Sequence, residues 1–290
     1  MLATSLETPR QTLPAAWPES KAGVPPRSCP ICGCDNRREP PSRYSRPPWL
    51  IKHCASCEFT YLENPPGYEA LEHEFAWERT KAAEAAHRHE LEPWLHRASA
   101  ALWAVTPRRV LQAKIVRLVR RYVEAGPLLD LGCGKGRTGI QVGRDYVPYG
   151  IEISNELASG ADYHFRQRGG RVINSDALSG LMSCEKNYFT GVVMKSYLEH
   201  ETNPQQVLEA ARRVMRPGAA LIIKVPNYAS WNRRLRQGRW CGFRYPDHVN
   251  YFTPRSLVLL LVSSGFVVER FQLRDRWPLS DNQWIVVRKR

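Results

Sequence analysis

Residues 128–136 read Leu128-Leu129-Asp130-Leu131-Gly132-Cys133-Gly134-Lys135-Gly136, an apolar run that ends in three closely spaced glycines. A short apolar run bounded by turn residues predicts a buried strand, and a helical pattern follows. Glycines at this junction let the backbone approach a ligand closely, and the N-terminus of the next helix favours a negatively charged group. The segment therefore predicts a strand, a turn and a helix that together bind a nucleotide-type ligand.

The glycine spacing excludes two common nucleotide-binding loops. A dinucleotide loop requires Gly-x-Gly-x-x-Gly, whereas Gly136 comes one residue early and Arg137 stands where the third glycine should be. A Walker phosphate loop requires Gly-Lys-Ser/Thr at a spacing that this segment lacks. The remaining pattern, Asp-x-Gly-x-Gly-x-Gly, resembles motif I of class I S-adenosylmethionine-dependent methyltransferases. The resemblance implies that the loop holds the amino-acid end of S-adenosylmethionine, with Asp130 and backbone groups towards its ammonium and carboxylate.

Two further acids follow later apolar runs, where this family places cofactor contacts. Glu152 stands 22 residues after Asp130, at the end of a strand-like run, and a carboxylate there can accept hydrogen bonds from both ribose hydroxyls. Asp176 follows the next run, and the resemblance implies that it accepts from the adenine amino group. Taken singly, each acid also suits a helix cap or a solvated loop. Three acids in order at predicted strand ends favour the cofactor, because ligands of open α/β sheets bind at that edge.

Later segments are similar to the small-molecule and sugar branch of the same family. They are Leu198-Glu199-His200, Asn203-Pro204, Arg216-Pro217-Gly218, Val225-Pro226-Asn227, Asp247-His248-Val249-Asn250-Tyr251-Phe252-Thr253-Pro254 with Ser256-Leu257, and Ser263-Ser264-Gly265-Phe266. The chain departs from the branch at Thr190-Gly191, where an acid is usual, and at Asn203, where Asp is usual. The resemblance covers the chain from about residue 29 to its last residue.

This resemblance implies an enzyme with a set of cofactor contacts and two candidate catalytic residues. The implied cofactor-binding residues are Asp130, Gly132, Cys133, Gly134, Gly136, Glu152, Ile153, Asp176, Ala177 and Lys195. Methyl transfer to a hydroxyl can require a general base, and histidine suits that role because its pKa lies near neutrality. His248 and His200 are the candidates, although His200 equally suits a helix-capping or core position beside the cofactor.

Strand-like runs alternate with helical segments through the second half of the chain. We expect strands at 127–131, 148–153, 171–174, 191–194, 220–225, 267–273 and 283–287. Strands that alternate with helices predict a largely parallel sheet with helices on both faces. The last two runs have no helix between them and should form an antiparallel pair at the sheet edge. The predicted fold class is α/β, a Rossmann-like seven-stranded, mostly parallel sheet with an antiparallel edge strand.

The chain also contains two Cys-x-x-Cys pairs, separated by 21 residues. Their members are Cys29, Cys32, Cys54 and Cys57. This spacing is typical of two zinc knuckles, and four thiolates close a tetrahedral, structural site. Free thiols or a redox pair are the alternatives, and Cys34 and His53 are spare potential ligands. We therefore predict a small zinc ribbon, whose tail resembles that of ribbons attached to methyltransferases in polysaccharide and natural-product pathways.

Composition and pattern divide the chain into four predicted parts. They are a tail at 1–27, the zinc ribbon at 28–66, a helical linker or lid at 67–122 and the methyltransferase domain at 123–290. The tail is rich in Pro, Ala, Ser and Thr without a hydrophobic period, which predicts mobility. The linker is rich in helix-forming residues, and we expect it to pack over the cofactor site.

The chain of 290 residues is basic, with 42 Lys and Arg against 28 Asp and Glu and a formal net charge of +14. Such an excess suits RNA, an anionic membrane surface or a phosphorylated substrate as a partner. Five arginines and no carboxylate lie in 231–245, interleaved with Trp231, Trp240 and Phe243, which suits an anion-binding surface or a solvated face. No secretory signal is visible, and the longest apolar stretch, 256–268, is shorter than the ~20 residues that span a bilayer. We expect a cytoplasmic protein.

Three functional hypotheses remain open at this point. The first is methyl transfer to a sugar, nucleotide-sugar or other small metabolite, with the arginines holding an anionic group. The second is an RNA methyltransferase that uses the ribbon and the basic surface to grip phosphates. The third is a binding protein with an inactive methyltransferase fold, which intact Asp130, Gly132, Gly134, Glu152 and Asp176 disfavour.

Overall fold

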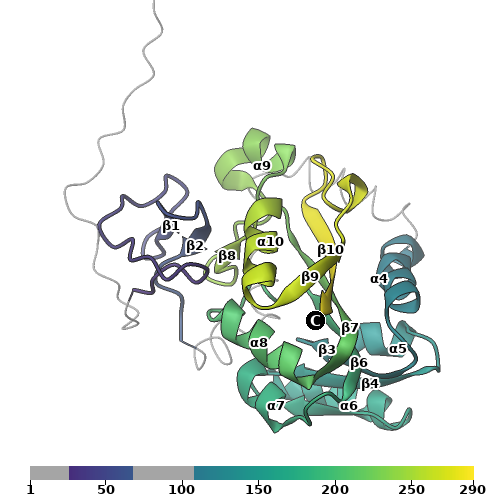
Figure 1. Cartoon of the computed structure of the whole chain (residues 1–290). Coiled ribbons are helices and arrows are strands. Elements are labelled where there is room, and N and C mark those ends of the chain that lie inside the picture. Colours follow the sequence, from purple (N-terminus) through teal and green to yellow (C-terminus); the bar gives the residue numbers. More distant parts are fainter. Residues whose placement is uncertain (1–25, 68–107) are drawn as a thin grey trace, which may run out of the picture.

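The structure is a computed structural model that describes residues 26–67 and 108–290 (Figure 1). The predicted mobile tail therefore lies almost wholly outside the described residues, and so does most of the predicted helical linker. The end of the linker is described as helix α4 (Arg108–Tyr122). No helix in these two ranges is long and apolar enough to cross a membrane.

Seven strands form the central sheet in the order β5-β4-β3-β6-β7-β10-β9. They are β3 (Gly126–Leu131), β4 (Tyr146–Glu152), β5 (Arg171–Asn174), β6 (Phe189–Lys195), β7 (Met215–Pro226), β9 (Phe266–Arg270) and β10 (Asn282–Lys289). Pairing is parallel from β5 to β7, and β10 runs antiparallel to both of its neighbours. The predicted α/β fold class is confirmed. The strand order reverses at β3 and β6, and ligands of such sheets bind outside the carboxyl ends of the strands at this point.

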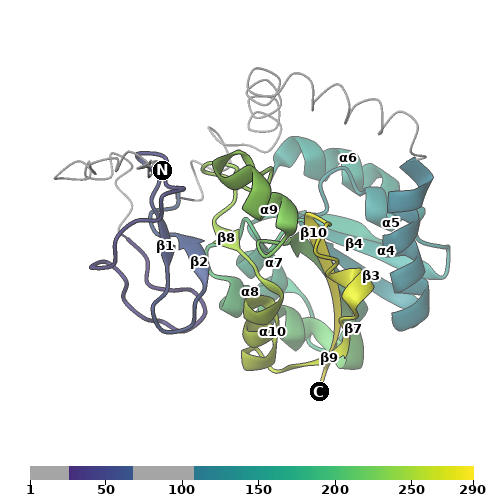
Figure 2. The same ribbon diagram turned by 90° about the horizontal axis from the view of Figure 1, so that it is seen from above.

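Helices cover both faces of the sheet (Figure 2). One face carries α4, α5 (Arg137–Gln141) and α6 (Asn155–Arg166), and the other carries α7 (Ala177–Ser183), α8 (Pro204–Val214) and α10 (Pro254–Ser263). Successive side chains of a strand point to opposite faces. Val193 and Ile222 accordingly pack with α4, whereas Val192 and Leu221 pack in the cluster with α7, α8 and α10. The central strands are apolar throughout because both faces are buried.

A second, small sheet joins the ribbon to the catalytic domain. Strands β1 (Ile51–His53), β2 (Thr60–Leu62) and β8 (Asn250–Tyr251) pair antiparallel in the order β1-β2-β8 (Figure 1). Apolar side chains from both parts form one buried cluster, which we call the junction core: Ile51, Leu62, Trp240, Phe243, Val249 and Tyr251. The ribbon thus shares a sheet and a core with the residues around β8.

Arg27 belongs to this junction, although the sequence pattern assigned it to the mobile tail. Its guanidinium donates hydrogen bonds to the carbonyl oxygens of Leu62 (2.8 Å), Thr202 (2.7 Å) and Val249 (2.6 Å). It also donates to Oδ1 of Asn250 at 3.1 Å. These acceptors come from three distant segments, so local composition carries no signal for them. The predicted tail is therefore wrong at Arg27.

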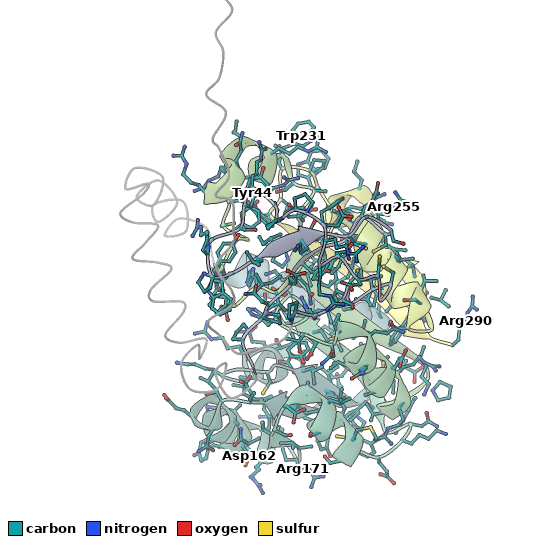
Figure 3. All side chains as sticks on the ribbon, turned by 90° about the vertical axis from the view of Figure 1, so that its left-hand side faces the viewer. Tyr44, Asp162, Arg171, Trp231, Arg255 and Arg290 are labelled. Carbon is teal, nitrogen blue, oxygen red and sulfur yellow. The ribbon has the colours of Figure 1, made fainter. Side chains whose placement is uncertain are left out.

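The arginine-rich segment lacks part of what the anion-binding alternative required. It folds as helix α9 (Trp231–Arg236), a 3-10 turn η1 (Gln237–Arg239) and a loop. Trp240 and Phe243 are only 2% and 1% exposed, because they fill the junction core. Of the three aromatic residues, only Trp231 lies on the surface, at the same end of the molecule as Tyr44 of the ribbon (Figure 3). The expected surface of interleaved arginines and aromatic rings is therefore not formed.

Candidate active site

The glycine-rich turn after β3 takes a conformation that glycine adopts readily. Gly132, Gly134 and Gly136 have φ of 67°, 52° and 67°. A Cβ on Gly132 would lie 2.7 Å from the Tyr197 ring, and one on Gly136 would lie 2.8 Å from the Phe165 ring. A Cβ on Gly134 would meet nothing within 4 Å among the described residues. The backbone is thus packed on both sides and open at Gly134, where a ligand can approach it closely.

Asp130 is buried beneath this turn, near the end of β3. Its side chain is 4% exposed, and burial raises the pKa of the carboxyl to about 7, against the opposing effects of the Lys195 charge and the Thr138 hydroxyl. Lys195 ends β6, the neighbouring strand, and is half-buried. A carboxylate held in this way gains most from a cationic ligand, because a nearby positive charge offsets its desolvation.

Glu152 ties the end of β4 to the glycine-rich turn. Its carboxylate accepts hydrogen bonds from the backbone N–H of Gly134 at 2.7 Å and of Ser154 at 3.1 Å. Cys133 and Ile153 flank this contact, the first buried and the second half-buried. Each carboxylate oxygen can accept further hydrogen bonds. The predicted ribose acceptor therefore stands at the carboxyl edge of the sheet, beside the open backbone.

Asp176 follows β5 and caps helix α7. Its Oδ1 accepts a hydrogen bond from the backbone N–H of Ser179 at 2.9 Å. Although burial acts in the opposite direction, the bond from Ser179 holds the pKa of Asp176 below its ordinary value. Ala177, the first residue of the helix, is buried. The alternative role as a helix cap is therefore real at Asp176, and the carboxylate still lies at the same sheet edge as Asp130 and Glu152.

The two candidate catalytic histidines lie together, beside a third ionisable residue. The rings of His200 and His248 pack edge to face with centroids 4.8 Å apart. Glu199 completes a group that we call the acceptor cluster, in which one ligand-type atom from each residue lies within 4.8 Å of the others. Glu199 and His248 are 1% and 5% exposed, and His200 is half-buried. The sequence motifs named both histidines but gave no role to Glu199.

Hydrogen bonds fix the tautomer of both histidines. Nδ1 of His200 lies 2.8 Å from the carbonyl oxygen of Asp247, and Nδ1 of His248 lies 2.8 Å from that of Gly242. A carbonyl oxygen can only accept, so each Nδ1 is the protonated donor. In the neutral rings, each Nε2 therefore carries a lone pair. Oδ1 of Asp247 also lies 3.5 Å from Nδ1 of His200, which supports the same arrangement.

The electrostatic surroundings shift the pKa values of the two histidines in opposite directions. Burial lowers the pKa of His200, but the Asp247 carboxylate outweighs burial and raises that pKa above its ordinary value. Burial lowers the pKa of His248 well below its ordinary value, and the charges of His200 and Arg244 act in the same direction. Burial also raises the pKa of Glu199. Sequence reasoning missed Glu199 and Asp247, and their only signal was their place next to the histidines in the two motifs.

Short backbone connections place the acceptor cluster beside the glycine-rich turn. Tyr197, whose ring packs on Gly132, accepts a hydrogen bond at its carbonyl oxygen from the N–H of His200 at 2.9 Å. The carbonyl oxygen of Glu199 accepts from the N–H of Val249 at 2.8 Å and of Asn250 at 3.1 Å. The side-chain amide of Asn250 donates to the carbonyl oxygen of Leu198 at 2.9 Å. The loop after β6 is thus held by β8, and through β8 by the ribbon.

The four cysteines of the ribbon meet at one point. The Sγ atoms of Cys29 and Cys57 are 3.5 Å apart, as are those of Cys32 and Cys54, and all four lie within 4.8 Å of one another. Thiolates at about 2.3 Å from a tetrahedral ion are about 3.8 Å apart, so the four sulfurs fit zinc. The two spare candidates lie outside this group: His53 contacts Thr60, and Cys34 contacts the carbonyl oxygen of Asp35 and lies near Cys54.

Arg233 and Arg244, from the arginine-rich segment 231–245, make internal contacts. The guanidinium of Arg233 lies 4.3 Å from the centre of the Tyr228 ring and donates to the Tyr228 carbonyl oxygen. Arg244 donates to Oδ2 of Asp247 at 2.6 Å. This part of the positive charge therefore supports the fold and the acceptor cluster.

Comparisons of sequence and structure find proteins that are similar to this chain. The family described as "Methyltransferase domain" matches residues 88–270. An uncharacterized protein of Methanocaldococcus jannaschii is 22% identical over 151 residues, which are 52% of this chain and 69% of that protein. A ubiquinone biosynthesis O-methyltransferase of Paraburkholderia phymatum is 31% identical over 104 residues, which are 34% of this chain and 44% of that enzyme. A solved structure from Bordetella parapertussis, described as a possible exported protein, has a TM-score of 0.50 at 16% identity and covers 64% of this chain and 69% of its own.

Proposed function

The chain belongs to the methyltransferase domain family and is a class I S-adenosylmethionine-dependent methyltransferase, and on this basis we propose that it methylates a hydroxyl of a small molecule held by His200 and His248. The observation that carries the proposal is the pair of Nε2 lone pairs in a buried cluster beside the glycine-rich turn. A hydroxyl can donate its proton to such an atom.

The residues at the carboxyl edge fit the cofactor. The open backbone at Gly134 and the buried Asp130 suit the amino-acid end of S-adenosylmethionine. The carboxylate of Glu152 suits the ribose, and that of Asp176 suits the adenine. We propose the same role for the other residues that the family resemblance implied: Gly132, Cys133, Gly136, Ile153, Ala177 and Lys195. When bound, S-adenosylmethionine supplies a methyl group on a positively charged sulfur.

The chain contributes mainly alignment and removal of water to such a transfer. Tyr197 and the loop after β6 bring the acceptor cluster to the side of the glycine-rich turn. The histidines orient the acceptor oxygen and take up its proton, and their carbonyl partners keep both rings in place. His200 is the more accessible of the two and is the proposed proton acceptor of the pair.

The burial of the acceptor cluster supports a small acceptor over RNA. Glu199 and His248 are almost fully covered, which favours a small reacting group. The name of the Paraburkholderia relative, a ubiquinone biosynthesis O-methyltransferase, agrees with a small-molecule hydroxyl. The net charge favours RNA, but the arginine-rich segment lacks the interleaved aromatic surface that single-stranded RNA would stack on.

We also propose that the ribbon binds one structural zinc ion through Cys29, Cys32, Cys54 and Cys57. Four thiolates leave no coordination position for a substrate. We propose that residues 28–66 form the ribbon and residues 123–290 the methyltransferase domain, and that the sheet β1-β2-β8 connects them.

Incubation with methyl-labelled S-adenosylmethionine and a fractionated cell extract tests the proposal. We expect label in low-molecular-weight metabolites that carry hydroxyl groups, and none when a protein with both histidines changed to asparagine is used. Label that sediments with RNA and disappears after ribonuclease treatment would instead establish the RNA alternative.

A further inference from the structure

We propose that Glu199, His200 and His248 bind a divalent transition-metal ion, and that this ion holds the oxygen of the acceptor. The inference rests on the proposed function, because the ion would lie on the acceptor side of the same site. It adds a metal site of different chemistry from the four thiols of the ribbon.

The spacing of the three ligand atoms fits one ion. They lie within 4.8 Å of one another. Nitrogen and oxygen ligands at about 2.1 Å from a tetrahedral ion are about 3.4 Å apart. Binding of one ion would draw the three ligand atoms closer together than they lie here.

The Nδ1 hydrogen bonds of His200 and His248 match those of metal-bound histidines. Such a histidine almost always donates its other ring N–H to a carbonyl or carboxylate oxygen, which orients the ring and exposes the lone pair. Nδ1 of His200 donates to the carbonyl oxygen of Asp247, with the Asp247 carboxylate nearby, and Nδ1 of His248 donates to that of Gly242. With Nδ1 used in this way, the Nε2 atom of each ring is left to bind an ion.

Glu199 supplies an independent observation. Its side chain is 1% exposed, and Oε2 has no hydrogen-bond partner among the residues that the structure describes. A buried carboxylate oxygen without a partner is unfavourable, and a cation removes that cost. Apart from His200, which belongs to the cluster itself, the nearby cations have other acceptors: Lys224 donates to Oγ of Ser196 at 2.7 Å, and Arg244 donates to Asp247. The unpartnered oxygen thus points to an ion that is not part of the chain.

The ligand set indicates both the type of ion and its chemistry. Two imidazoles and one carboxylate suit Zn²⁺, Fe²⁺ or Co²⁺ and leave coordination positions open. A hydroxyl that binds such an ion becomes more acidic and loses its proton to solvent. Its oxygen then forms the new bond to the methyl carbon while the bond from that carbon to sulfur breaks, and S-adenosylhomocysteine leaves. With an ion present, the histidines act as its ligands and the ion takes over the activation of the hydroxyl.

Cobalt titration of the full chain tests the site apart from catalysis. The ribbon is left filled with zinc, which is colourless, and loosely held metal is removed with a weak chelator. We expect one equivalent of Co²⁺ to bind with weak visible bands and without the strong near-ultraviolet bands of cobalt–thiolate bonds. Glu199→Gln and His248→Asn should each weaken this binding at least 100-fold, with unchanged melting temperature and S-adenosylmethionine affinity. His164→Asn, which changes an exposed histidine on α6, is the matched control and should bind Co²⁺ like the parent.

The outcomes separate this inference from the proposed function. If the parent binds no Co²⁺, or if both variants bind it like the parent, the metal site does not exist. Undiminished methyl transfer by such metal-free protein would leave the proposed function standing. Conversely, bound Co²⁺ together with label in RNA would keep the metal site and remove the small-molecule acceptor.

Discussion

Two groups of side chains that could each hold a metal ion border the small sheet β1-β2-β8, and their chemistry differs. The four cysteines adjoin β1 and β2 and form a closed set of thiols. The acceptor cluster takes Glu199 and His200 from the loop after β6, and His248 from the residues before β8. A closed set of thiolates stabilises a fold, whereas an open set of imidazoles and a carboxylate handles a substrate. With the roles proposed above, the chain separates the two tasks in chemistry but connects the two groups through one sheet.

The largest effect is expected from removal of the ribbon thiolates. This change tests whether methyl transfer at the acceptor cluster depends on the four cysteines. Cys54→Ser with Cys57→Ser should abolish methyl transfer and lower the melting temperature by more than about 10 °C. Structural zinc sites contribute about 10–16 kcal/mol of binding free energy, comparable with the whole stability of a domain, about 5–15 kcal/mol. Calorimetry and zinc analysis measure this, with Cys34→Ser, outside the four-thiol group, as the control. A stable, active variant would show that the ribbon is only an appendage.

Changing the acceptor cluster should give the next largest effect, and it should leave the fold intact. His200→Asn is expected to reduce the rate of methyl transfer by about 10²–10⁴, the usual contribution of a positioned acid-base group. S-adenosylmethionine should bind within about twofold of the parent, because His200 lies on the acceptor side. Single-turnover kinetics and calorimetric titration measure the two quantities. Loss of cofactor affinity would contradict the division of roles.

Arg27 offers a smaller perturbation that sharpens the comparison, because it bonds to both sides of the connection. Arg27→Met removes the donors for the carbonyl oxygens of Leu62, Thr202 and Val249. We expect a loss of about 2–4 kcal/mol in the free energy of unfolding and a rate of methyl transfer about tenfold lower. Denaturant unfolding and steady-state kinetics measure these changes.

Arg255 is the matched control for this experiment. It also links the two parts, through an ion pair with Glu58 in which the side chains are 85% and 65% exposed. Exposed pairs contribute little, so Arg255→Met should leave the unfolding midpoint unchanged. Equal effects of the two substitutions would mean that the buried contacts of Arg27 have no special role.

The smallest effect lies outside both groups, at Asp130, and serves as a reference for pH. The carboxyl has a pKa of about 7 in the folded chain and about 3.9 when unfolded, so the unliganded fold loses stability as pH rises from about 4 to 7. The affinity for cationic S-adenosylmethionine should change in the opposite direction and be about tenfold weaker at pH 6 than at pH 8. Asp130→Asn should abolish both dependences, which calorimetry across this pH range would measure. A pH-independent affinity in the parent would contradict this role.

Local patterns made much of the fold, the four thiols and the two histidines of the acceptor cluster predictable. The alternating apolar runs gave all seven strands of the main sheet, and the Cys-x-x-Cys spacing named the four thiols, because both depend on neighbours in sequence. Glu199 and His248 stand 49 positions apart, and they meet only because β8 pairs with the ribbon and holds the loop after β6. The burial of Trp240 and Phe243 and the contacts of Arg27 depend on the same long-range pairing. The sequence carries no periodic signal for such contacts.

The pairing of β2 with β8 also constrains how the chain is made. Leu62 leaves the ribosome long before Asn250, which follows it by 188 residues. The nascent hairpin of β1 and β2 therefore has an unpaired edge for most of translation. Zinc can fill the ribbon early, but the hairpin gains its third strand only after the main sheet has largely emerged. A nascent chain stalled before β8 would therefore expose the unpaired backbone groups of β2. We expect chaperones and proteases to recognise such fragments.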